Sequence, residues 1–241
     1  MKEVRYFHVP DAAVATELPQ EEAQHAAKVL RLESGDEVFL MDGMGTFYRA
    51  ELTLVSQKHC LYNILETLPQ EKAWHGSIHV AIAPTKNIDR MEWMVEKCTE
   101  VGFDGITFLN CRFSERKQIR KDRIEKIVTA AAKQSRKPFF PCVNDMTDFR
   151  KFVPECKTGR KFICHCYDEI ERKDFFRELS AADKDTDITV LVGPEGDFSI
   201  DEVQYALSQG FESITLGDFR LRTETAGLVA TTVAQMLKRN I

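Results

Sequence analysis

The sequence lacks any apolar run near the roughly 20 residues that a membrane-spanning helix needs. Its first residues also lack the apolar core of a signal peptide. We therefore expect a cytoplasmic protein with no membrane partner. Hydrophobic residues make up 43% of the 241 residues and charged residues 29%, which is typical of a globular protein with one large or two modest domains.

The seven cysteines show no disulfide framework, because their number is odd and the chain is long. The one tempting metal motif is Cys164-His165-Cys166. It has a single residue between its cysteines and no second half nearby, unlike a zinc site. It also lies in an apolar run that reads as a buried strand. We therefore expect no metal.

The chain has no excess of basic charge, since its formal net charge is −5, so overall charge does not indicate a nucleic-acid partner. The exception is local: residues 112–137 contain ten basic and three acidic side chains. Such a stretch can hold phosphate even on an acidic protein. A solvated helix face explains it equally well.

Residues 1–70 are expected to form a small β-barrel-like domain. Strand-like composition covers residues 4–9, 37–41, 46–56 and 59–68, and two glycines at 43 and 45 mark a hairpin. One helix interrupts the strands: Pro19 suits its first turn and Gly35 follows its end. Residues 68–72 read as a linker.

Residues 71–241 change to alternating strands and helices. Strands are expected at 78–83, 106–109, 162–166, 188–192 and 213–216, and helices at 86–101, 122–135 and 223–238. Ser199 and Glu202 form a capping-box pattern at the start of a further helix. Such alternation predicts an α/β domain with a parallel sheet covered by helices on both faces.

Two glycine-marked loops follow strands of this domain. Open α/β sheets bind ligands at the carboxyl ends of their strands, where glycine lets the backbone approach a ligand. Neither nucleotide fingerprint, G-x-G-x-x-G or G-x-x-x-x-G-K-[ST], is present. The first loop, Gly193 to Gly196, therefore suits an adenosine or methionine-like ligand better than a triphosphate; an ordinary strand–helix turn is the alternative.

The second loop gathers charge. Arg220, Arg222 and Glu224 alternate with uncharged residues, and an extended segment would place all three on one side. The following helix start offers hydroxyl and amide donors that can stabilise developing negative charge. An ordinary salt bridge is the alternative reading.

Together the two loops resemble the signature of the SPOUT methyltransferases, and more narrowly of the family that methylates N3 of a uridine in bacterial 16S ribosomal RNA. The resemblance rests on Gly-Pro-Glu-Gly at 193–196, Leu-Gly at 216–217 and Leu-Arg-Thr-Glu-Thr-Ala at 221–226. Further matches extend it over nearly the whole chain; they lie at 5–7, 25–31, 35–36, 86, 92, 96–97, 100–102, 112–115 and 131–136.

The resemblance implies a PUA-like RNA-binding domain at 1–70 and, at 71–241, a SPOUT domain with a trefoil knot that binds S-adenosylmethionine. It also implies a homodimer that acts on 16S rRNA or the small ribosomal subunit. The cofactor residues implied are Leu191, Val192, Gly193, Pro194, Glu195, Gly196, Leu216, Gly217, Leu221, Arg222, Thr223 and Ala226. The RNA-binding residues implied are Arg5, His25, Lys28, Arg31, Arg112, Arg116 and Arg136.

Arg222 and Glu224 are the expected catalytic residues. N3 of uridine is a poor nucleophile until its proton leaves, so the site must favour the uridine anion. Arg222 or a neighbouring arginine is expected to stabilise that charge, and Glu224 or Glu195 to orient the base or accept the proton.

Two positions depart from the family pattern. Asp197 stands where a third small residue, commonly glycine, is usual, and Asp218-Phe219-Arg220 replaces a proline–arginine–aliphatic sequence. Two other functions stay open at this point. One is SPOUT methylation of a ribose 2′-oxygen or a tRNA base, and the other is a non-catalytic RNA-binding or ribosome-assembly factor.

Overall fold

The computed structural model describes residues 5–239, and the chain forms two compact units. The first contains the chain up to residue 72 together with residues 129–140, and the second contains the remainder. The domain division at residues 70 and 71 stays a prediction. No helix among the described residues is long and apolar enough to span a membrane.

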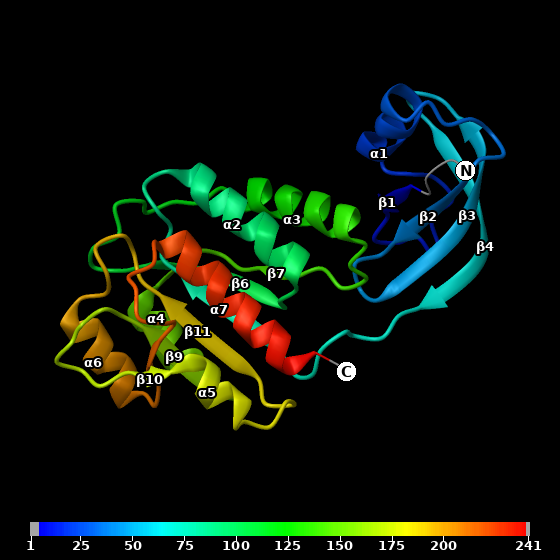
Figure 1. The fold of residues 1–241 in the computed structure, drawn as a ribbon. Helices are drawn as coiled ribbons and strands as arrows, with labels where there is room; N and C mark the ends of the chain where they lie inside the picture. The colour runs from blue at the N-terminus through cyan, green and yellow to red at the C-terminus, as the bar shows by residue number, and fades with distance from the viewer. Residues whose placement is uncertain (1–4, 240–241) are drawn as a thin grey trace. The chain divides into compact units, whose positions relative to one another are not determined.

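The first unit is a four-stranded sheet with one short helical segment (Figure 1). Its strands lie in chain order, with β1 parallel to β2 and the other pairs antiparallel. The elements are β1 (Tyr6–His8), α1 (Gln20–Gln24), the π-helical η1 (His25–Val29), β2 (Glu37–Met41), β3 (Thr46–Val55) and β4 (Cys60–Pro69). The expected strands are present; the first is shorter than expected, and its Val4 lies outside the described residues.

Alternate side chains along each strand of this sheet are buried, which explains why these residues form strands. Phe7, Val38, Leu40, Ala50 and Leu52 are fully buried on its inner face, as alternation along each strand requires. The β2–β3 hairpin turns through two glycines with positive φ, and Oδ1 of Asp42 accepts hydrogen bonds from the backbone N–H groups of residues 44 and 46. The expected hairpin is confirmed.

The second unit is built on a sheet whose strand pairs are all parallel. The main path runs β10-β12-β9-β11-β5-β6-β7, and β8 pairs with β6. Its strands are β5 (Ile78–Ile82), β6 (Gly105–Asn110), β7 (Cys142–Val143), β8 (Thr147–Asp148), β9 (Arg160–Cys164), β10 (Lys173–Asp174), β11 (Ile188–Val192) and β12 (Glu212–Thr215). The expected parallel α/β architecture is confirmed.

Helices cover both faces of this sheet. On one face α4 (Phe149–Glu155) and α6 (Ile200–Ser208) share a core with buried residues of β5, β9 and β11. On the other, α7 (Thr223–Lys238) contacts β5, β11 and α2 (Ile88–Val101), and Figure 1 shows it lying across the strands. The remaining helices are α5 (Phe175–Ser180) and α3 (Lys121–Ser135), whose residues from 129 onward belong to the first unit.

Gly227 sets how closely α7 approaches its neighbours. A Cβ atom there would lie 2.5 Å from Sδ of Met94 on α2 and 3.1 Å from Cδ1 of Ile82 on β5. The first turn of α7 is thereby held close to the sheet. The loop before it consequently meets the ends of β9 and β11.

Candidate cofactor pocket

Three adjacent strands end at one edge of the sheet and form a pocket of about 910 Å³. Parallel pairing of β12, β9 and β11 brings together the segments that follow them, 164–172, 192–197 and 214–226. Arg90 of α2 completes the lining. The expectation that the two glycine-marked loops form one composite site matches this geometry.

The loop after β11 is tightly closed. The backbone N–H of Asp197 donates to the carbonyl of Pro194 at 2.8 Å, and a Cβ on Gly193 would lie 2.9 Å from the backbone nitrogen of Phe198. The loop ends at the expected capping box of Ser199 and Glu202, which is present. The absence of a side chain at Gly193 therefore lets the backbone at Phe198 pack against it.

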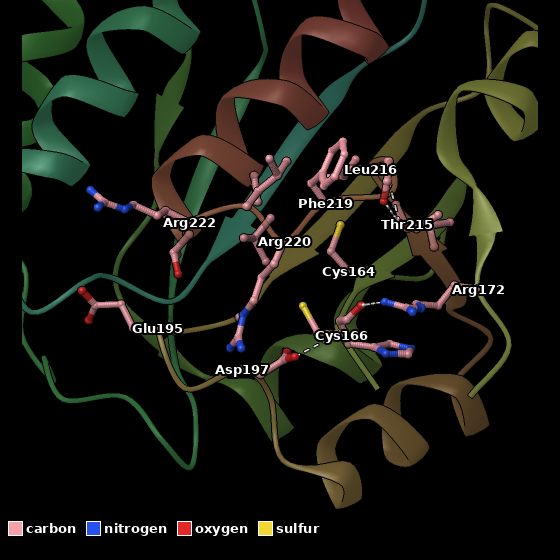
Figure 2. A pocket seen from close by; sticks show the side chains of 18 of the residues that line it. Cys164, Cys166, Arg172, Glu195, Asp197, Thr215, Leu216, Phe219, Arg220 and Arg222 are labelled. Carbon is pink, nitrogen blue, oxygen red and sulfur yellow. Dashed lines mark hydrogen bonds between the residues drawn. The ribbon is translucent and has the colours of Figure 1, made fainter. Parts of the chain in front are cut away.

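The loop before α7 is not the extended segment expected from its sequence. Arg222 is the N-cap of α7, and Glu224 already lies in the first helical turn. The expectation that Arg220, Arg222 and Glu224 share one side is therefore wrong. Alternate residues lie on the same side only in an extended segment, and this segment becomes helical at Thr223. Figure 2 shows the Arg220 and Arg222 side chains pointing in different directions.

Glu224 is buried beneath this loop and does not line the pocket. Only 7% of the residue is exposed, and its Oε2 atom is buried without a hydrogen-bond partner. Its Oε1 atom lies 3.7 Å from Nη1 of Arg90, which is also 3.7 Å from Oε1 of Glu195. Arg90 thus lies between the two carboxylates.

Glu195 is the more accessible carboxylate of the two. Its side chain is 38% exposed and lines the pocket, and its Oε2 atom accepts a hydrogen bond of 3.0 Å from the backbone N–H of Lys86. This contact fixes the carboxylate at the rim. Of the two, Glu195 is the one that a bound molecule can reach.

Most of the expected cofactor residues meet in the pocket. Two of them do not line it: Leu191 is fully buried in the core next to α4 and α6, and Gly196 is exposed on the outer side of its loop near Phe113. The expected residues that line it are Val192, Gly193, Pro194, Glu195, Leu216, Gly217, Leu221, Arg222, Thr223 and Ala226.

The segment after β9 was missed as part of the site. β9 ends at Cys164, so His165 and Cys166 begin a loop that lines the pocket. Burial lowers the pKa of His165, whose Nε2 lies 2.8 Å from Oγ of Ser213. No group of three or more potential metal ligands occurs among the residues described. The position of this motif at the end of a central strand was the signal that could have identified it.

The expected RNA-binding residues fall in both units. In the first unit Lys28 and Arg31 are exposed, and the guanidinium of Arg136 lies over the Tyr6 ring, 5.2 Å from its centroid. The Arg5 carbonyl accepts a hydrogen bond from the N–H of Phe39, and the His25 ring lies near that of Phe7.

The two expected RNA-binding residues of the second unit are already engaged. Arg112 pairs with Asp201 at 3.2 Å. The Arg116 guanidinium donates to the backbone carbonyls of Thr85 and Lys86 at 3.1 and 2.6 Å. Arg116 therefore has the contacts of a residue that holds the loop after β5.

Two family models match this chain. An RNA methyltransferase domain matches residues 72–235, and an RNA methyltransferase PUA domain matches residues 18–65. The first match covers more than half of the chain.

Individual proteins agree with this assignment. A crystal structure described as a "probable rRNA-methyltransferase" from Porphyromonas gingivalis is 35% identical, with a TM-score of 0.89 over 98% of each chain. Ribosomal RNA small subunit methyltransferase E of Neisseria gonorrhoeae, bound to S-adenosyl methionine, is 26% identical, with a TM-score of 0.83 over 98% of each chain. The protein of that name from Synechocystis sp. is 29% identical over 84% of this chain and 67% of its own length.

The matches cover both units and agree with the fold. The chain therefore belongs to the RNA methyltransferase family, and the resemblance of its loops to those of the SPOUT methyltransferases is confirmed.

Proposed function

We propose that this protein transfers the methyl group of S-adenosylmethionine to N3 of a uridine in 16S ribosomal RNA. One observation carries the proposal: the pocket at the strand ends combines apolar side chains with carboxylates and with four arginines. The names of the relatives from Neisseria gonorrhoeae and Synechocystis sp. support the substrate, and the bound ligand of the former supports the cofactor.

The residues of the pocket fit the cofactor. Leu216 and Leu221 offer apolar surface for an adenine ring, and no atom lies within 4 Å of the Cβ position of Gly217, which leaves its backbone accessible. When bound, S-adenosylmethionine supplies a methyl group on a positively charged sulfur. Carboxylates near the pocket suit that charge, and Glu195 is among the lining residues.

Arg222 is the proposed stabiliser of the uridine anion. It is exposed at the pocket edge, and its side chain makes no ion pair or hydrogen bond within residues 5–239. A free guanidinium can donate to the carbonyl oxygens that flank N3 as the proton leaves. Because Glu195 is accessible and Glu224 is buried, we assign the proton to Glu195 and assign Glu224 the positioning of Arg90.

Uridine N3 lies on the pairing edge of the base, so the base must be exposed before it reacts. Phe219 is 86% exposed beside Arg220 at the pocket. An exposed aromatic ring next to arginine is a common surface for unstacked RNA bases. This surface supports RNA as the substrate.

The experiment that tests this function is methylation of small ribosomal subunits and of free 16S rRNA with isotopically labelled S-adenosylmethionine. Mass spectrometry of the nucleosides is expected to show N3-methyluridine. A ribose 2′-O-methylated nucleoside, or label only in added tRNA, would establish one of the other targets. Failure to bind S-adenosylmethionine in calorimetry would establish a non-catalytic RNA-binding factor.

Arg136→Ala is expected to weaken binding of 16S rRNA by about fivefold and to reduce the salt slope of that binding by roughly 0.7–1. The reason is that Arg136 is exposed and has no acidic partner among the described residues, so its charge is available to phosphate. Filter binding across a range of salt concentrations measures both quantities.

Arg116→Ala is the matched control, because its guanidinium is already bound to two carbonyls. It is expected to lower the free energy of unfolding by about 1–2 kcal/mol and to leave the salt slope unchanged. Equal salt slopes for Arg136→Ala and the unaltered protein would contradict the role of Arg136.

We also propose that the protein is a cytoplasmic homodimer and that its SPOUT domain is knotted, as the family resemblance implies. Trp93 on α2 and Met236 on α7 are 45% and 55% exposed, and such apolar side chains on two contacting helices are consistent with a subunit interface. Sedimentation velocity tests the dimer: Trp93→Glu is expected to shift it toward monomer, and an unchanged sedimentation coefficient would contradict this interface.

A further inference from the structure

Arg220 is a pocket arginine without a protein counter-ion. It lines the pocket from the loop before α7, and its guanidinium makes no hydrogen bond or ion pair within the described part of the chain. Figure 2 shows its side chain extending across the pocket toward Asp197 and Glu195. Its positive charge is therefore directed at the pocket interior, whereas the Arg222 side chain is directed elsewhere.

Asp197 is the opposite charge on the facing wall. Its φ of +70° lies in the left-handed region that favours glycine. Two hydrogen bonds hold it there: Oδ2 accepts from the backbone N–H of Cys166 at 2.8 Å, and Oδ1 from that of Phe198 at 2.7 Å. Each oxygen keeps a second lone pair, and no Lys, Arg or His ion pair engages the carboxylate among residues 5–239.

Both charges act on the same part of the pocket. Burial raises the pKa of the Cys166 thiol; the negative charge of Asp197 raises it further, and the positive charge of Arg220 opposes that rise. Arg220 and Asp197, both among the described residues, nevertheless form no ion pair with each other. The space between them is therefore flanked by one positive and one negative charge.

We propose that Arg220 and Asp197 bind the amino acid end of S-adenosylmethionine, Arg220 through its carboxylate and Asp197 through its ammonium group. This inference rests on the proposed cofactor. An α-amino acid carries the two charges on neighbouring groups, and a guanidinium and a carboxylate on facing walls are complementary to it. Arginine suits the first task because its planar donors match a carboxylate.

The pair also connects the two departures from the family pattern. Asp197 stands where a small residue is usual, and Arg220 lies in the segment where proline, arginine and an aliphatic residue are common. The side chains at these two positions, which lie in different loops, thus face the same part of the pocket. A single ligand group explains both.

Calorimetry with two ligands tests the assignment. S-adenosylhomocysteine and 5′-methylthioadenosine share adenosine and an uncharged thioether, but only the first has the amino acid group. Arg220→Ala is expected to lower the affinity for S-adenosylhomocysteine about tenfold to a hundredfold and the affinity for 5′-methylthioadenosine less than about twofold. Arg220→Lys, which keeps the charge, is expected to recover part of the loss.

Asp197→Asn is the second variant, since it removes the charge. Its amide oxygen keeps one of the two backbone hydrogen bonds and its NH2 group loses the other, so the affinity for 5′-methylthioadenosine reports any change in the loop itself. The variant is expected to lower the affinity for S-adenosylhomocysteine about tenfold and to leave the affinity for 5′-methylthioadenosine unchanged. Arg150→Ala removes an arginine that lies over the Tyr205 ring and outside the pocket lining, and it is expected to change neither affinity.

Equal weakening of both ligands by Arg220→Ala would overturn the proposal, because the residue would then only shape the pocket. Unchanged affinity for both ligands with weaker binding of 16S rRNA would also overturn it, in favour of an RNA contact. If the unaltered protein bound neither S-adenosylmethionine nor S-adenosylhomocysteine, the proposed function itself would fail.

Discussion

Arg222→Ala is expected to lower the rate of methyl transfer to 16S rRNA by about 100-fold or more, because one donor to a developing oxyanion contributes that much in comparable sites. Affinity for S-adenosylmethionine should change by less than about twofold, since a group that acts on the transition state need not bind the cofactor. Single-turnover methylation and calorimetry measure the two quantities separately.

The fold should survive this substitution. Arg222 is the N-cap of α7, but its side chain makes no capping hydrogen bond, so the unfolding midpoint in urea is expected to stay unchanged. Arg222→Lys retains the charge without the planar donors and should restore part of the rate. A full rate for Arg222→Ala with normal cofactor affinity would remove Arg222 from the mechanism.

Gly193→Ala is expected to weaken the binding of S-adenosylmethionine by about tenfold to a hundredfold. The added Cβ would lie 2.9 Å from the backbone nitrogen of Phe198, so the loop itself must move. Overpacking of this kind costs about 1–3 kcal/mol, which corresponds to that loss of affinity if the displaced loop is the cofactor site. Calorimetric titration of the variant measures the effect.

Gly196→Ala is the matched control in the same loop. Its added Cβ would make an ordinary contact of 3.4 Å with Cβ of Phe113, and Gly196 does not line the pocket. We expect the affinity of this variant for S-adenosylmethionine to stay within about threefold of that of the unaltered protein. If both substitutions weakened the cofactor equally, the loop would not bind it in the way proposed.

The sequence predicts the longer strands and helices of the second unit because their patterns are local, but it does not predict the short elements β7, β8, β10, α4 and α5. Burial of both sheet faces makes β5, β6 and β11 rich in aliphatic and β-branched residues, and α7 begins and ends at its expected residues. The position of two loops at strand ends followed from these elements alone. The capping box likewise needs only two residues, Ser199 and Glu202.

The rest of the site depends on which strands are neighbours, and no local pattern reports this. β9 lies between β11 and β12, so the loop from His165 to Arg172 enters the pocket, yet its sequence reads as the end of a buried strand. Arg90 lies in α2, far from either loop in the chain, and reaches Glu195 and Glu224 only through the packing of α2 on α7.

The backbone conformation of the two loops could not be predicted from the sequence either. Asp197 departs from the usual small residue, but only the structure shows that it keeps a left-handed φ and uses its carboxylate to bind two backbone N–H groups. The alternating charges of residues 220–224 suggested one extended face. Helix α7 begins within that segment and separates them.

The central claim is best tested by mapping modified uridines in 16S rRNA from cells that lack this protein. We predict the loss of N3 methylation at one uridine, its restoration by the unaltered protein, and no restoration by Arg222→Ala. An unchanged pattern of N3-methylated uridines in the deletion strain would contradict the proposed function.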